Sequence, residues 1–238
     1  MKQTDLILSP LLIPAYPPFD GETVYVVADV LRASASIIAA FENGARAVYP
    51  LETVAEAEEK ARLGYLVGAE RNAEKLPFAH LGNDPFEYTR EAVENREIYF
   101  TTTNGTRTIK ACFRANPGAA VVIGSFPNLS AVARFCLDKS VYVVAAGWKG
   151  KVSLEDALFG AALFDRLRAT HAPASDALRM IAPLYDPRQV VERVKSADHY
   201  ARLVRTGKTA SFVHCLTPDT ADLLPIARLT DDQIRISL

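Results

Sequence analysis

The residues best suited to chemistry lie in a polar stretch that reads Thr-Thr-Thr-Asn-Gly-Thr-Arg and ends at Arg107. An apolar segment at 97–100 predicts a strand before it, and 106–114 predicts a helix after it, so the stretch should form the turn between them. Backbone N–H groups at a helix start lack intrahelical partners and attract anions. Arg107 adds a guanidinium suited to phosphate, which makes it a catalytic candidate. The alternative is a threonine-rich helix cap with a surface arginine. Candidate donors to an anion are Thr102, Thr103, Asn104, Gly105 and Thr106.

A second candidate site follows the apolar run 24–28, whose β-branched residues are typical of a strand covered on both faces. Asp29 ends this run. A carboxylate at the end of a buried strand is desolvated unless a cation neutralises it, so Asp29 is a candidate metal ligand or nucleophile. Arg32 follows in the turn before a predicted helix at 37–42, and is a candidate for holding an anion.

Further acids and donors follow other predicted strands. Glu70 and Arg71 come after a short strand at 65–67, where a surface ion pair is the alternative. Glu155 and Asp156 open a long helix predicted from 153 to 168, where helix capping is the alternative. The strand at 120–123 is followed by two more candidate donors, Ser125 and Asn128.

Carboxylates and arginines in one site favour a divalent cation held by oxygens beside an anionic ester. Mg²⁺ fits because it takes one or two carboxylates and leaves room for phosphate oxygens. Phosphoryl transfer needs mainly positioning and charge stabilisation, which a metal and arginines supply. Two other classes stay open: a non-catalytic binder of small phosphate, sulfonate or carboxylate anions, and a phosphoryl-transfer enzyme that uses an acceptor other than water. The metal candidates are Asp29, Glu70 and Asp156, and the anion clamps are Arg32, Arg71 and Arg107.

Alternating strands and helices predict an α/β fold with three layers, α/β/α, around a mostly parallel or mixed sheet. Placing Tyr25 on Tyr99 aligns 24–63 with 98–137, which indicates two similar βαβα halves within a single compact domain, 1–238. The polar turns of both halves would then converge at the carboxyl ends of the strands. A mainly helical part should follow at 173–238. Apolar segments at 6–8, 223–229 and 234–237 are expected to form edge strands.

Composition excludes several classes of function. The chain has 238 residues, 49% hydrophobic and 23% charged, with a net charge of −1, which is ordinary for a folded protein and lacks the positive charge of a nucleic-acid or anionic-membrane binder. With no run of 18 apolar residues and no signal-peptide pattern, a cytoplasmic location is expected. A small anionic phosphate ester is the expected partner, and a homo-oligomer stays open.

The cysteines and histidines lack the spacing of a metal site. Each of the three cysteines lies in an apolar segment, so buried thiols are expected at Cys112, Cys136 and Cys215. His80 lies in a polar loop, and a functional role for it stays open. The remaining histidines are expected to be structural or solvent-facing, namely His171, His199 and His214.

Several segments of the chain resemble the 2-phosphosulfolactate phosphatase family. They read ADVLRASAS, GAER, LGNDPFEYT, TTTNGTRTI, IGSFPNLSAVA and SLEDALFGA, and span 24–167, with a weaker match at 209–229. The resemblance implies Mg²⁺-dependent hydrolysis of the phosphate ester of a small 2-hydroxy acid, a reaction that this family performs in coenzyme M biosynthesis. Attack on phosphorus by Asp29 or by a metal-bound water stays open. The chain departs from the family pattern around Glu70, which lacks the usual glycine-rich surroundings, and at Trp148, where a smaller turn is usual.

Overall fold

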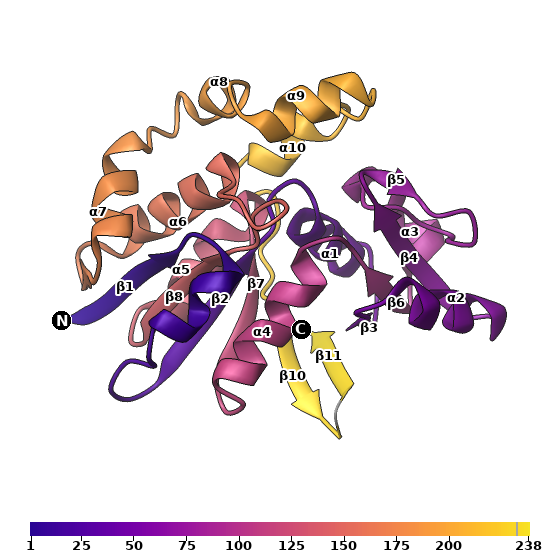
Figure 1. Ribbon diagram of the computed structural model, residues 1–238, viewed down its shortest axis with the longest axis horizontal. Coiled ribbons are helices and arrows are strands. Elements are labelled where there is room, and N and C mark those ends of the chain that lie inside the picture. Colours follow the sequence, from indigo (N-terminus) through magenta and orange to yellow (C-terminus); the bar gives the residue numbers. More distant parts are fainter. Residues whose placement is uncertain (232) are drawn as a thin grey trace.

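Helices cover both faces of one mixed sheet in the computed structural model, which describes residues 1–231 and 233–238 (Figure 1). Within this part of the chain the sheet has eleven strands in the order β5-β4-β6-β3-β11-β10-β7-β2-β8-β1-β9. The α/β/α prediction is therefore confirmed. The strands are β1 (Lys2–Ile7), β2 (Thr23–Ala28), β3 (Ala47–Pro50), β4 (Leu66–Arg71), β5 (Glu74–Lys75), β6 (Glu97–Thr101), β7 (Ala120–Gly124), β8 (Ser140–Ala145), β9 (His171–Pro173), β10 (Ile226–Thr230) and β11 (Gln233–Ser237).

Helices connect most of these strands, and their bounds follow local sequence signals. For example, Thr53 and Glu56 form the capping box that their spacing predicts, with Glu56 N–H donating to Thr53 Oγ1 at 3.1 Å. The α-helices are α1 (Ala33–Glu42), α2 (Val54–Arg62), α3 (Arg90–Val93), α4 (Gly105–Ala115), α5 (Leu129–Cys136), α6 (Leu154–Leu167), α7 (Asp176–Ile181), α8 (Val190–Val194), α9 (Asp198–Arg205) and α10 (Phe212–Leu216). Short 3-10 helices occur at Pro10–Ala15, Pro85–Glu87, Phe126–Asn128 and Ala182–Leu184.

The central strand β2 shows how the core is divided between the two faces of the sheet. Its side chains alternate, so Val24 and Val26 pack in the cluster that contains α5 and α6 residues. Tyr25 and Val27 point to the other face and pack in the cluster that contains α1 and α4 residues. Every residue of β2 is buried, as expected for a strand covered on both sides.

The antiparallel hairpin β10–β11 lies inside the sheet, between β7 and β3, which corrects the expectation that these segments form an edge. Its contacts with the flanking strands are short: β10 pairs with β7 at two positions, and β11 pairs with β3 only through Ile236 and Val48. The hairpin therefore joins two half-sheets, β5-β4-β6-β3 and β7-β2-β8-β1-β9. Figure 1 shows it at the bottom of the molecule.

The first strand, β1, is also not an edge strand. It pairs in parallel with β8 on one side and with β9 on the other. The expectation was wrong because β9 covers only three residues, His171–Pro173, which are too few to show an alternating pattern in the sequence.

Two helices carry the chain between the half-sheets. Helix α1 leads from β2 to β3, and α4 leads from β6 back to β7, so β2 lies beside β7 and β3 lies beside β6. The amino ends of the two helices meet, because a Cβ on Gly105 would lie 2.9 Å from the Cβ of Ala33. The ends of β2 and β6, which are not neighbours in the sheet, are thereby brought together.

Helices α8, α9 and α10 lie above this meeting point, at the top of the molecule in Figure 1. They belong to the mainly helical segment that begins at α7. The segment packs its apolar residues, such as Val194, Leu203 and Phe212, in the cluster that also contains α5 and α6 residues. These C-terminal helices therefore cover the place where the ends of β2 and β6 meet, although they are distant from both strands in sequence.

Candidate active site

A crevice lies where the turns after β2, β4 and β6 face α9. The residues from the strand-end turns that line it are Asp29, Leu31, Arg32, Glu70, Ala73, Asn83, Thr102, Thr103 and Asn104. Helix α9 contributes His199, Arg202 and Leu203. The free volume inside is about 20 Å³, which holds about one water molecule. The predicted convergence of separate polar turns is thus seen for the turns after β2, β4 and β6.

Asp29 sits between the amino ends of two helices. The Ala33 N–H at the start of α1 donates to its Oδ1 at 3.2 Å, and its Oδ2 lies 3.0 Å from the position of a Cβ on Gly105, the first residue of α4. Burial raises the pKa of Asp29 to about 6, with the positive charge of His199 opposing the shift and the charges of Glu70 and Glu155 adding to it. An ionised Asp29 is therefore costly in this site unless a cation lies beside it.

Glu70 lies inside β4, which is longer than the predicted strand. Its Oε1 accepts hydrogen bonds from the Ala73 N–H at 2.7 Å and from Thr103 Oγ1 at 3.1 Å. Its Oε2 accepts a longer bond, 3.4 Å, from Asn83 Nδ2. The Glu70 carboxylate thus connects the turn after β4 to the turn after β6.

Two buried oxygens of the crevice residues have no hydrogen-bond partner within the described part of the chain. They are Asn83 Oδ1 and Thr102 Oγ1. Thr102 Oγ1 lies 3.4 Å from the same Gly105 Cβ position that Asp29 Oδ2 approaches, so these two oxygens lie near one another. Buried polar atoms normally find partners, and unpaired ones therefore point to a ligand or ion.

This donor set fits Mg²⁺, which prefers oxygen ligands and needs only one or two carboxylates. Asp29 Oδ2, Asn83 Oδ1 and Thr102 Oγ1 supply a carboxylate, an amide and a hydroxyl oxygen. Among residues 1–231 and 233–238, no three acidic, histidine or cysteine side chains come close enough together to form a metal site by themselves. A site in which substrate and water oxygens complete the coordination is consistent with that finding.

Asp156, predicted as a metal ligand, lies behind the crevice and does not line it. Its Oδ1 accepts from the Val30 N–H at 2.9 Å and its Oδ2 from the Gly147 N–H at 3.0 Å. Burial raises the pKa of Asp156 well above its usual range, and the charges of Glu155 and Asp29 add to this. The structure thus shows Asp156 tying together the turns that follow β2 and β8.

Of the three predicted arginine clamps, only Arg32 lines the crevice. It is buried and forms an ion pair with Asp84, and its Nη1 also donates to Ser211 Oγ at 3.2 Å. Arg71 turns aside, with its Nη1 donating to the Glu70 carbonyl at 2.6 Å and its Nη2 to Thr101 Oγ1 at 2.9 Å. Arg107 is exposed on α4.

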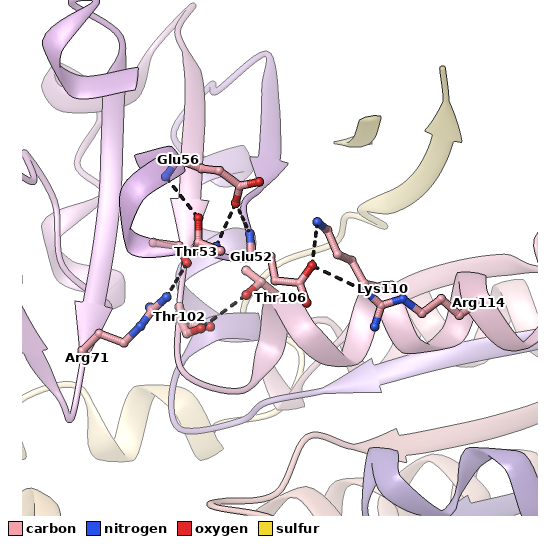
Figure 2. A network of polar contacts seen from close by, with 9 residues as sticks. Glu52, Thr53, Glu56, Arg71, Thr102, Thr106, Lys110 and Arg114 are labelled. Atoms are coloured by element: carbon pink, nitrogen blue, oxygen red, sulfur yellow. Dashed lines mark hydrogen bonds and ion pairs between the residues drawn. The ribbon is translucent and has the colours of Figure 1, made fainter. Parts of the chain in front are cut away.

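The charges of Arg71 and Arg107 nevertheless interact, although neither residue lines the crevice. Burial lowers the pKa of Arg71, the charge of Glu70 opposes this, and the positive charge of Arg107 lowers it further. Figure 2 shows Arg71 next to the Thr102 turn, where the Thr106 hydroxyl donates to the Thr102 carbonyl at 3.3 Å. Thr106 therefore stabilises the turn, and its hydroxyl does not face the crevice lining.

Ser125 and Asn128, predicted as anion donors, are buried away from the crevice. The Ser125 N–H donates to Asn128 Oδ1 at 2.9 Å, and Asn128 Nδ2 donates to the Ile123 carbonyl at 3.1 Å. These bonds close the turn after β7, which starts the helical segment that follows it. The sequence does not separate a capping pair from a ligand pair, because both use the same residue types at the same strand end.

Helix α9 brings three residues to the crevice that the sequence did not indicate, namely His199, Arg202 and Leu203, and Asn83 is a further lining residue that was not predicted. His199, expected to be structural or solvent-facing, lines the crevice, with its Nδ1 2.6 Å from Oε1 of the fully buried Glu155. Its ring stacks on Trp148, and the Arg202 guanidinium carbon lies 5.0 Å from the centre of the same indole. Only the departure at Trp148 from the family pattern pointed toward this part of the molecule. His80 stays outside, where its Nδ1 accepts from the Val67 N–H at 3.3 Å.

Carboxylates, arginines and unpaired oxygens at the strand ends of an α/β sheet define a candidate enzyme for small anionic substrates. A model of the family described as 2-phosphosulpholactate phosphatase matches residues 9–230. The chain therefore belongs to this family, as its motifs indicated, and is a phosphatase that acts on a phosphoric monoester.

Relatives named "Probable 2-phosphosulfolactate phosphatase" extend this result over most of the chain. The protein from Thermotoga maritima is 36% identical over 224 residues, 93% of each chain. That from Caldanaerobacter subterraneus is 37% identical over 209 residues, 84% of this chain and 86% of the relative, and that from Gloeobacter violaceus is 33% identical over 94% of each. Within the described residues, no helix has both the length and the apolar character that crossing a bilayer requires.

Proposed function

We propose that this phosphatase hydrolyses the phosphate ester of a small 2-hydroxy acid, of the 2-phosphosulfolactate type, to the hydroxy acid and inorganic phosphate, and that the reaction requires Mg²⁺. The names of the relatives support the type of substrate. The observation that carries the proposal is that Asp29, Asn83 and Thr102 bring a carboxylate and two unpaired oxygens to one crevice.

The residues that would hold Mg²⁺ are Asp29, Asn83 and Thr102, with Glu70 orienting Asn83. When bound, the ion supplies positive charge that neutralises the phosphoryl oxygens. Glu70 fixes the Asn83 amide through its Oε2 and the Thr103 hydroxyl through its Oε1. This fixed geometry lowers the cost of reorganisation during the reaction, because the polar groups are already in place.

The phosphate group belongs at the amino end of α4. The helix has eleven residues and begins directly after the crevice-lining residues Thr102, Thr103 and Asn104, and the free N–H groups of a helix start favour a phosphate there. Gly105 at its start leaves space for close approach, since its missing side chain would meet Asp29 Oδ2 and Thr102 Oγ1. Asp29 and the phosphate are both negative, so a bound cation would lower the repulsion between them.

The direct test measures phosphate release from a panel of 2-phospho acids with Mg²⁺ and with a chelator. We expect release only with Mg²⁺. Asp29→Asn should abolish release while circular dichroism shows an unchanged fold, whereas Asp138→Asn, a change at an exposed acid, should leave the rate unchanged. A non-catalytic binder would instead release no phosphate, and its Asp29→Asn variant would bind 2-phospho acids as tightly as the wild type or more tightly.

A further inference from the structure

The crevice is too small for a phosphate ester of a hydroxy acid. Its free volume of about 20 Å³ compares with the roughly 300 Å³ or more that is usual for small-molecule sites. The wall opposite the strand ends is formed by His199, Arg202 and Leu203, all from α9. A substrate therefore needs a wider opening between α9 and the strand ends than this structure has, and closure would return these side chains to the bound substrate.

Arg202 is the notable residue of that wall because its charge is buried without an acidic partner. As a whole residue it is 8% exposed, and within the described residues no hydrogen bond or ion pair engages its guanidinium group. Its nearest described interaction is with the face of Trp148, 5.0 Å away. A buried cation in this condition is costly, and an arriving anion removes the cost.

The surrounding charges show that Arg202 faces the crevice. Burial lowers the pKa of Arg202, the negative charge of Glu70 opposes this shift, and the positive charges of Arg205 and Arg32 add to it. Glu70 and Arg32 both line the crevice from the strand side. Arg32 is already paired with Asp84, so Arg202 is the lining arginine whose positive charge is still uncompensated.

The two sides of the crevice thus have different roles. The strand ends present the amino end of α4 and the oxygens of Asp29 and Thr102, which suit a phosphate and its cation. Helix α9 presents a planar guanidinium across from them, which matches the two oxygens of a carboxylate or sulfonate. A substrate with acids at both ends spans this arrangement.

We propose that Arg202 is a specificity-determining residue, which pairs with an acidic group of the substrate other than the phosphate when α9 closes. This inference rests on the proposed function for the identity of the substrate, and adds the residue that selects it. The ring face of Trp148 holds the Arg202 guanidinium in position. His199, which is also on α9, stacks on the same ring.

The test measures binding by calorimetry to the full chain with two probes: sulfolactate, which carries a carboxylate and a sulfonate, and inorganic phosphate, which carries neither. Arg202→Met should weaken sulfolactate binding at least tenfold and change phosphate binding less than twofold. Arg205→Met is the matched control, because Arg205 is an exposed arginine on the same helix, and it should change neither affinity more than twofold. Arg202→Lys keeps the charge without the planar fork, and should recover part of the affinity.

A second measurement follows α9 directly. Trp148 is the one tryptophan in the sequence, so its fluorescence reports on Arg202 and His199. Sulfolactate should change its emission in the wild type and not in Arg202→Met. The inference would be overturned if Arg202→Met weakened the binding of sulfolactate and of phosphate equally, or left the affinity for sulfolactate unchanged. It would also be overturned if the wild type did not bind sulfolactate. If no 2-phospho acid is hydrolysed but sulfolactate binding still depends on Arg202, the proposed function fails and the inference about Arg202 stands.

Discussion

Asp29 and Gly105 come from different βαβα segments and lie close together, with Asp29 Oδ2 3.0 Å from the point that a Cβ on Gly105 would occupy. This approach is possible because α1 and α4 cross between the half-sheets and meet at their amino ends. A carboxylate at two helix amino ends receives favourable dipole interactions while it remains buried. The contact between these residues is therefore the structural centre of the candidate active site.

Gly105→Ala should lower kcat/KM at least tenfold. The added Cβ would come within 3.0 Å of Asp29 Oδ2 and 2.9 Å of the Ala33 Cβ, so either the carboxylate or one of the helices must shift. A displacement of this kind changes a catalytic geometry strongly. Gly118→Ala is the control, because its nearest contact is Asn116 Oδ1 at 3.8 Å, and it should keep wild-type kinetics. Unchanged kinetics for the Gly105 variant would show that this close contact is not needed for activity.

Asp29→Asn should stabilise the protein at neutral pH in the absence of Mg²⁺. The folded pKa of Asp29 is raised from 3.8 to about 6, so its contribution to stability is fully present below pH 3.8 and is lost as the pH rises through about 6. A shift of about two pKa units corresponds to about 3 kcal/mol at pH 7.5. Urea unfolding with chelator at pH 4 and pH 7.5 measures the effect. The variant should be more stable than the wild type only at the higher pH, and a smaller gap is expected when Mg²⁺ is added.

Arg32→Met should lower the free energy of unfolding by about 3 kcal/mol, because it leaves Asp84 without its partner in a largely buried ion pair. It should also reduce activity, since Arg32 lines the crevice. Arg134→Met removes the same charge from an exposed pair with Asp222, whose side chains are 59% and 79% exposed, and should cost less than about 1 kcal/mol. Urea unfolding of both variants checks the contrast. Equal losses would mean that burial does not determine the strength of these pairs.

The cysteines should not react with a thiol reagent while the protein is folded. All three are buried and free, as the sequence predicted. Burial raises the pKa of Cys136 and of Cys215 to about 12, and also raises that of Cys112, so the reactive thiolate is scarce at neutral pH. Titration with Ellman's reagent should find no fast-reacting thiol in the native protein and three in denaturant. A fast-reacting thiol in the native state would identify a local opening of the core.

The strand ends of the site could be predicted from the sequence because each has a local signal. A buried apolar run that ends in Asp29, and the polar turn that contains Thr102, mark both the strand and its carboxyl end. Parallel strands present these ends on one side, so residues distant in sequence are expected to meet. The same reasoning predicted Ser125, which is not among the residues that line the crevice, because residue types alone do not distinguish a donor to a ligand from a donor to the backbone.

The contribution of α9 could not be predicted in this way. His199 and Arg202 lie in a short helix with ordinary composition, and nothing near them in the sequence specifies which strand ends they cover. Their position depends on the packing of the C-terminal helices on the cluster around α6. The position of the β10–β11 hairpin inside the sheet also depends on long-range strand pairing, such as that of Ile236 with Val48. No local sequence pattern encodes such pairing.

The crossing of α1 and α4 has a consequence for how the protein can be divided. The first βαβα segment contains β2 and β3, and the second contains β6 and β7. In the sheet β2 lies beside β7 and β3 lies beside β6, so the two strands of one segment are not neighbours. A chain cut in the loop between α3 and β6 would leave two interlocked pieces that need one another to fold. Catalytic competence would then return only on mixing the fragments, as complementation rather than as the sum of two independent units.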